Sequence, residues 1–387
     1  MTQPSTIAVT DITQMIDPVT FIKSAVDART VNAVAELLTK LKVVHEDAYA
    51  FDEKDPTKGW VEGQLHWYPV GGELANARSI QLADKPEFPI AERTVNAHEA
   101  LIELMRRREL IANPGATPPK SPRDAVTRYF DIPTLDELPL HDGGLPPKGP
   151  LYKRARELAA KVRVKAQPVK SPEKIAGKKE ASKEWCVSIE DEGIGQPPGA
   201  VHSSLLSLGA SDKADKPYLI GLFGQGGSSA YRAAQYSWIV SRRAPDLLGG
   251  AEDGVGWTII KRIAPPGIRR VYWAYLAAHP DGRVPVFPVT VAATIGLVHG
   301  TRIAHVGYDF GRFDVVLTLY RALNHLLFNP VLPYELYTGR ESPDVMFGNA
   351  YRLAKAKVKS DTKESKQPGS GDVSVYRTFP EQLVEYK

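Results

Sequence analysis

The chain has 387 residues, 43% of them hydrophobic, so it can bury a full core, and its length predicts two or three structural units. No run approaches the roughly 20 apolar residues that cross a bilayer, and the N-terminal residues lack the layout of a signal peptide, so we expect a cytoplasmic protein without a membrane partner. The net charge of +4 is too small to indicate a nucleic-acid partner by itself, and the single cysteine, Cys186, excludes an internal disulfide and a multi-cysteine zinc site.

The first third of the chain carries mostly helical patterns. Apolar residues at three- and four-residue steps predict two short amphipathic helices over 18–43, which would form an N-terminal helical cap. Residues 63–74 predict two strands around the turn Gly71-Gly72. A longer helix is expected to begin after Pro89 and to run to about residue 110.

The middle of the chain combines loop sequence with basic sequence. Residues 112–150 are rich in proline and glycine, with one short helical stretch near 123–130. Residues 151–183 hold many lysines and arginines against few acids and predict a basic arm, part helix and part flexible. Such an arm can contact nucleic-acid phosphates, and a solvated linker explains the composition equally well.

Strand-like segments dominate the second half of the chain. Apolar, β-branched and aromatic runs bounded by turn residues predict strands at 185–191, 236–244, 256–263, 269–277, 287–295 and 300–308. Helical stretches at 200–210 and 229–235 fall between the first two strands, and the later strands follow one another as a meander. This order predicts an α/β (α+β) sandwich with a mixed, mostly antiparallel sheet. The charged segment 354–372 predicts a disordered linker.

Glu92 and Asn96 lie four residues apart on the helix predicted after Pro89. This step puts a carboxylate and a carboxamide on one helix face, so both can reach the same bound group. The pair suits a general base that orients water beside an oxygen ligand for Mg²⁺. Exposed Glu and Asn pairs are also common on ordinary helices, so the pair alone is weak support for a site.

The strand at 185–191 ends in a carboxylate and runs into two glycines. Gly193 and Gly195 let the backbone approach a flat ligand, and Asp191 can accept a hydrogen bond from an exocyclic amine such as that of adenine. Taken alone, the motif is equally consistent with a plain β-turn.

Two further motifs follow. Residues 221–229 (GLFGQGGSS) are dense in glycine and precede a helix-like stretch, a pattern that frees backbone N–H groups for phosphates and allows lid motion. The segment lacks the Gly-Lys-Ser/Thr of a Walker A loop. Gly300-Thr301 enters a strand, where the hydroxyl can hold a water or a nucleobase or can simply open the strand.

The four motifs, in this order, resemble the signature of the GHKL ATPases, the superfamily of gyrase, the large heat-shock chaperones, histidine kinases and MutL. The resemblance covers roughly residues 65–310 and implies the adenine-binding (Bergerat) sandwich of that family. It implies Glu92 as the general base and Asn96 as the Mg²⁺ ligand. The further residues implied for ATP binding are Asp191, Gly193, Gly195, Ser211, Lys213, Gly221, Phe223, Gly224, Gln225, Gly226, Gly227, Ser228 and Thr301.

Within this resemblance, Asp191 would contact adenine with support from Thr301, and the glycines of 221–227 would form the phosphate-binding lid. Ser211-x-Lys213 resembles the Ser-x-Lys that precedes the lid in the MORC and MutL branches. Two departures stand out: Glu99 occupies the position of the usual aspartate, and the insert between the first two motifs is longer than the family norm.

The resemblance also divides the chain. We expect an N-terminal helical cap in 1–60, a GHKL ATPase domain in 61–310 with a basic insert at about 112–183, the start of a transducer-like unit in 311–352, and a flexible linker and tail in 353–387.

Function is expected to follow the MORC/MutL-like branch, in which ATP joins two chains and hydrolysis releases them. We expect Mg²⁺-dependent ATP binding, slow hydrolysis and an ATP-dependent homodimer that acts as a clamp, in DNA transactions or anti-phage defence, with DNA contacted by the basic arm 151–183. The alternatives are a nucleotide-sensing scaffold that does not hydrolyse ATP and a chaperone-like protein. Glu92 favours hydrolysis. A histidine kinase is disfavoured, because its catalytic domain would follow a dimerising helical hairpin that bears a phosphoacceptor histidine. The first 60 residues hold one histidine, His45, which we interpret as an exposed loop residue.

Overall fold

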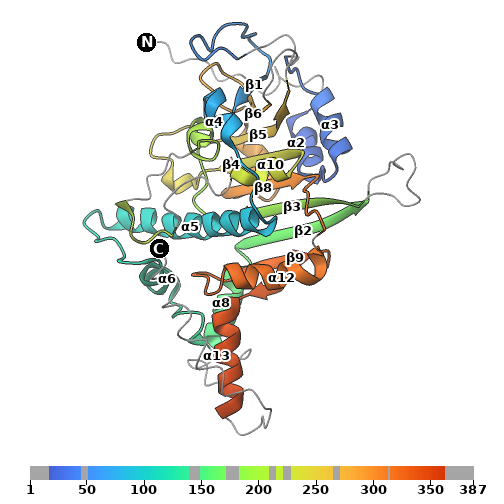
Figure 1. The fold of residues 1–387 in the computed structure, drawn as a ribbon. Coiled ribbons are helices and arrows are strands. Elements are labelled where there is room, and N and C mark those ends of the chain that lie inside the picture. Colours follow the sequence, from blue (N-terminus) through green and yellow to red (C-terminus); the bar gives the residue numbers. More distant parts are fainter. Residues whose placement is uncertain are drawn as a thin grey trace.

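The protein is a mixed α/β protein built on one large open sheet, seen in a computed structural model (Figure 1). The structure describes residues 17–44, 51–138, 149–170, 183–208, 215–220, 228–264, 271–312 and 314–361. Ten strands of this described part form the sheet, and neighbouring strands are antiparallel except for β2 and β9. The predicted mixed, mostly antiparallel sheet is therefore confirmed.

The strand order differs from the order along the chain. It runs β1 (His66–Pro69), β6 (Tyr272–Ala277), β5 (Val255–Ile263), β4 (Tyr236–Arg242), β8 (Gly300–Val306), β3 (Lys183–Asp191), β2 (Val162–Lys170), β9 (Tyr334–Thr338) and β10 (Asp344–Met346), with β7 (Val286–Phe287) paired to β5. Only part of the predicted meander forms: β4, β5 and β6 follow one another in the sheet, whereas β8 returns to lie between β4 and β3. This return puts Asp191 opposite Thr301 in adjacent strands.

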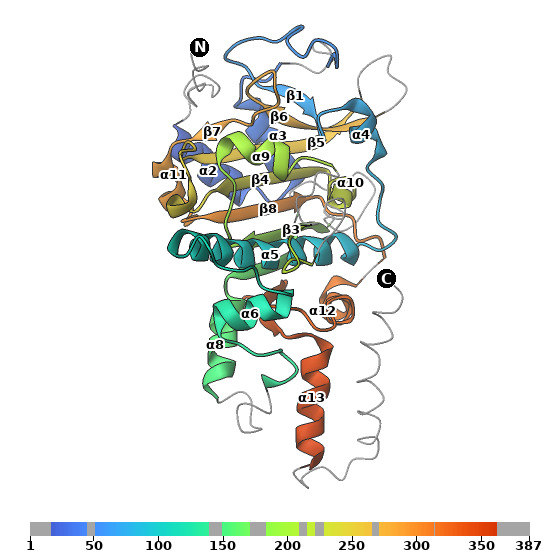
Figure 2. The same cartoon turned by 90° about the vertical axis from the view of Figure 1, so that its left-hand side faces the viewer.

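One face of the sheet is covered by α2 (Pro18–Asp27), α3 (Val31–Thr39) and α11 (Val289–Thr294) (Figure 2). The two N-terminal helices are those predicted, and each begins at a side-chain cap, since Asp17 accepts from the Thr20 N–H and Thr30 from the Ala33 N–H. Phe21 of α2 packs on the Trp257 ring of β5, with ring centroids 5.3 Å apart.

The long helix α5 (Glu87–Ala112) covers the opposite face, together with α4 (Leu74–Ser79), α9 (Val201–Ser204) and α10 (Ser229–Ala233) (Figure 2). α5 begins two residues before Pro89. A proline is tolerated there because the first N–H groups of a helix have no intrahelical acceptor. Leu101 and Ile102 are buried in the same core cluster as Ile189 of β3, which fixes α5 beside the strand that carries Asp191.

Residues 311–361 continue the same sheet. α12 (Val315–Leu326) packs on α5, β9 pairs in parallel with β2, and α13 (Gly348–Asp361) follows β10. The insert contributes α6 (Pro122–Phe130), which matches the helical stretch predicted there, and α8 (Pro150–Ala159). The transducer-like assignment of 311–352 stays a prediction.

The expectation of a partly flexible basic arm is wrong for 162–170, which form β2. Its side chains alternate, with Val162, Val164 and Ala166 fully buried. Arg163 donates to Glu192 at 3.0 Å and Lys165 to Glu190 at 2.8 Å, so these charges are paired across the sheet. Residues 171–182 of the arm lie outside the described residues.

Three further element predictions are corrected. Residues 63–74 contain one strand, β1, followed by α4, because β1 pairs with the distant β6 rather than across the Gly71-Gly72 turn. Residues 289–294 form α11 rather than a strand, because Val291 and Ala292 are buried in the core cluster that includes α2. The predicted linker is helical up to Asp361 as α13, and its residues 362–372 lie outside the described part.

Within the described ranges, no helix combines the length and the apolarity that a bilayer span needs.

Candidate functional site

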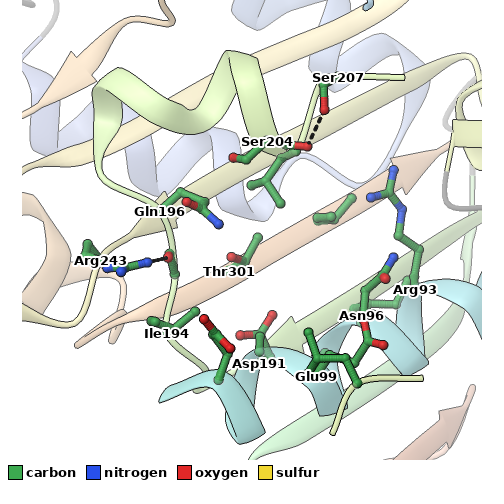
Figure 3. Close-up of a pocket in the computed structure, with 18 of the residues that line it drawn as sticks. Arg93, Asn96, Glu99, Asp191, Ile194, Gln196, Ser204, Ser207, Arg243 and Thr301 are labelled. Atoms are coloured by element: carbon green, nitrogen blue, oxygen red, sulfur yellow. Dashed lines mark hydrogen bonds between the residues drawn. The ribbon is translucent and has the colours of Figure 1, made fainter. Parts of the chain in front are cut away.

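A cavity of about 690 Å³ lies between α5 and the segment around α9, with β3 and β8 beneath it (Figure 3). Asn96 of α5, Asp191 at the end of β3, Thr301 of β8, Gly195 and Ser228 all line it. These five predicted residues come from distant parts of the chain, so the fold brings them together around one space.

The other predicted residues divide into two groups. Glu92 is exposed on α5, one helical turn before Asn96, and is not among the residues that line the cavity; Gly193 is buried in the turn that follows Asp191. Eight residues lie outside the described part of the chain: Ser211, Lys213, Gly221, Phe223, Gly224, Gln225, Gly226 and Gly227.

Asp191 is the carboxylate of the cavity floor. Its Oδ1 accepts the Gly193 N–H at 2.8 Å, an Asx-type turn that holds the chain in place as it leaves β3. Burial raises the pKa of Asp191 to about 7, although backbone hydrogen bonds from Gly193 and Thr301 favour the ionised form. A carboxyl group in this state can accept a hydrogen bond from a bound amine, and that bond would draw it toward ionisation.

The turn after Asp191 is held on both sides. The Ile194 N–H donates to the Ala100 carbonyl of α5 at 3.0 Å, and the Ala244 N–H donates to the Ile194 carbonyl at 2.9 Å. A methyl group on Gly193 would lie 2.5 Å from the Ala100 Cβ, so only glycine allows this approach to the helix.

Thr301 belongs to a small hydroxyl network. Its Oγ1 lies 2.9 Å from the Ser241 Oγ, which also accepts the Gln196 N–H at 2.9 Å. Ser241 is buried in β4. It is not predicted from the sequence, because a serine in a strand belongs to no recognisable motif. The network fixes the Thr301 hydroxyl and the turn backbone relative to each other.

The segment just before the glycine-rich motif is anchored on α5. The Ile220 N–H donates to the Glu99 carboxylate at 2.6 Å. Glu103 accepts from Lys216 at 3.2 Å, from the Tyr218 hydroxyl at 3.0 Å and from Arg107 at 2.9 Å. The two glutamates thus hold residues 215–220 against α5, directly ahead of residue 221.

Replacing Glu103 by glutamine is expected to weaken the attachment of residues 215–220 to α5. The amide cannot pair with Lys216 and Arg107, so we expect amide hydrogen exchange in 215–220 to accelerate roughly 10-fold, measured by hydrogen–deuterium exchange with mass spectrometry. Glu36→Gln on the exposed face of α3 is the matched control. Unchanged exchange in 215–220 would mean that Glu103 does not hold the segment.

Several residues of the cavity wall carry no sequence motif, among them Arg93, Gln196, Ser204, Ser207 and Arg243 (Figure 3). For Arg93 a signal existed, since it lies three residues before Asn96 and therefore near it on the helix surface. Ser204 ends the four-residue helix α9, and Ser207 and Arg243 lie in loops, so no periodicity predicts that these side chains face a cavity.

Comparison of the chain with models of protein families gave no match, and comparison with curated proteins gave none either.

Proposed function

We propose that this chain is a GHKL-type ATPase that binds Mg²⁺-ATP in the cavity between α5 and β3 and hydrolyses it slowly. The observation that supports this most is the convergence on one cavity of Asn96, Asp191 and Thr301, from three motifs far apart in the sequence. The remaining expectations from the resemblance, a dimerising clamp with a DNA or defence role, stay predictions.

The chemistry of the wall fits a nucleotide. Asp191 offers an acceptor for the exocyclic amine of adenine, and Ile189, Ile194 and Ile303 provide apolar surface for the flat base. Asn96 lies on α5, where its carboxamide oxygen can face the phosphate side. Such a division between an apolar, amine-accepting part and a polar part is what an adenine nucleotide requires.

Magnesium would enter with the nucleotide. In the described part of the chain, no group of three or more His, Cys, Asp and Glu side chains could hold a metal ion. Mg²⁺ is commonly held by substrate phosphates together with one or two protein oxygens and water. Asn96 would supply the protein oxygen, and the ion would neutralise phosphate charge.

The experiment that tests the proposal is nucleotide binding as a function of pH. An ionised Asp191 accepts the amine hydrogen bond, and its pKa of about 7 in the free protein means that most molecules are protonated at pH 6. Affinity for ADP is therefore expected to fall about 10-fold for each pH unit below 7 and to level off above it. Calorimetry between pH 5.5 and 8.5 measures this.

Asp191→Asn is the matched variant, because it keeps the size of the side chain and cannot ionise. It should bind ADP more weakly at pH 8 and lack the additional pH slope of the wild type, while titration of the ligand itself affects both proteins equally. Parallel pH slopes in the two proteins would show that Asp191 does not contact the bound nucleotide. If the wild type binds neither ADP nor ATP, the proposal is overturned.

A further inference from the structure

Arg93 is a buried cation in the wall of the cavity. The residue is 6% exposed and lines the cavity from α5, three residues before Asn96 (Figure 3). The guanidinium carbon lies 5.0 Å from the centroid of the Tyr231 ring, which belongs to α10 and also lines the cavity. This cation–π contact satisfies none of the guanidinium N–H groups.

The guanidinium lacks a counterion. Its Nε and Nη2 are buried without a hydrogen-bond partner, and no carboxylate of the described residues forms an ion pair with it. His305, which is buried nearby and feels this charge, has its pKa held well below the usual range by burial and by Arg93, so it is neutral and provides no compensation. A buried charge of this kind is costly unless an anion joins it.

The other cations of the wall are already occupied. Arg107 and Lys216 both pair with Glu103. Arg243 donates to the carbonyl oxygens of Gly195 and Leu247. Within the described part of the wall, Arg93 is thus the cation left for a ligand.

The position of Arg93 along α5 indicates which part of a nucleotide would reach it. Ala100 contacts the turn beside Asp191. Arg93 lies seven residues earlier, which is about 10 Å along the helix at the rise of an α-helix. That separation is comparable to the length of a nucleotide from its base to its outer phosphates. Figure 3 shows Arg93 beside Asn96, on the side of the cavity away from Ile194 and Arg243.

We propose that Arg93 binds the terminal phosphate of a nucleoside triphosphate and gives the cavity its preference for triphosphate over diphosphate. The proposal rests on the proposed function of the site. A guanidinium suits this task because its planar N–H groups match phosphate oxygens in pairs. Tyr231 would keep the guanidinium group oriented before the ligand binds.

The test compares three ligands on Arg93 variants. A non-hydrolysable ATP analogue, ADP and adenosine, the first two with Mg²⁺, are titrated into the wild type, Arg93→Met and Arg93→Lys. We expect Arg93→Met to weaken binding of the analogue about 10- to 100-fold and to change ADP and adenosine affinity less than about threefold. Arg93→Lys should recover part of the loss. Thermal melting identifies any variant that fails to fold. If Arg93→Met does not fold, the comparison with the wild type is made with Arg93→Lys.

Arg108→Met is the matched control, since Arg108 lies on the same helix, pairs with Asp246 and does not line the cavity. It should leave the preference for the triphosphate unchanged. Equal weakening of the analogue and ADP by Arg93→Met, or no weakening of either, overturns the role of Arg93 while the site itself stands.

A wild type that binds none of the three ligands overturns the proposed function. Tripolyphosphate is the probe in that case. If it binds the wild type and is lost with Arg93→Met, the anion site stands without the nucleotide; if it does not bind, both proposals fall.

Discussion

Replacing Glu92 by glutamine is expected to lower kcat for ATP hydrolysis by about 10²- to 10⁴-fold, the usual contribution of a general base. The amide cannot take a proton from the attacking water. Glu92 is exposed and does not line the cavity in this structure, so the general-base role requires its side chain to turn toward the attacking water when ATP binds. Because the side chain makes no contact that shapes the site, the affinity for ATP should change less than about threefold. Steady-state phosphate release and calorimetric binding measure the two quantities.

Glu157→Gln is the control, because Glu157 is an exposed helical glutamate on α8 with only a long 4.0 Å ion pair to Lys153. It should leave both kcat and affinity unchanged. If Glu92→Gln turns over ATP at the wild-type rate, Glu92 is not the base. If the wild type binds ATP without turnover, the chain is the nucleotide-sensing scaffold instead.

Gly195→Ala is expected to destabilise the protein by about 2–5 kcal/mol and to abolish nucleotide binding. Gly195 has a φ of +61°, which strains any residue with a Cβ, and the added methyl group would overlap the carbonyl of Arg242. Relief requires β4 or the turn to move, and this turn borders the cavity. Urea unfolding gives the stability, and ADP titration gives the binding.

Gly199→Ala makes the same chemical change nearby without the same conflict, since an added methyl group there meets no atom within 4 Å. It should unfold at the wild-type urea concentration within error and bind ADP normally. Equal stability of the two variants would show that the turn at Gly195 can rearrange freely.

Local composition in the sequence predicts the strands that are apolar throughout. β4, for example, carries the run Trp238, Ile239 and Val240, and all three residues are buried as this composition indicates. α11 was missed because its β-branched residues favour a strand locally, whereas burial against α2 and the Arg302 bond to the Ile295 carbonyl stabilise a helix.

β2 was missed for a different reason. Its period-two alternation is present in the sequence, but Arg163 and Lys165 were assigned to a basic arm, because their partners Glu190 and Glu192 follow in a separate segment. Pairing partners that depend on strand order, as for β2 with β9, leave no local pattern at all.

The site was predictable to the extent that it is made of motifs. Asn96, Asp191, Gly195 and Thr301 follow from short patterns in order, and the structure gathers them around one cavity. Ser241, Glu103 and Arg93 act through contacts between elements, which only the assembled sheet and α5 reveal.

The sheet order also has a consequence for how the chain acquires its structure. Trp67 of β1 pairs with Leu276 of β6, and Arg163 of β2 pairs with Glu335 of β9, so both flanks of the sheet join segments that are far apart along the chain. Contacts of such high sequence separation slow folding, because the entropy of closing a long loop is lost before the contact forms. During synthesis, β1 emerges long before β6. β2 can pair with β3 soon after it emerges, but its other edge stays open to other chains until β9 arrives.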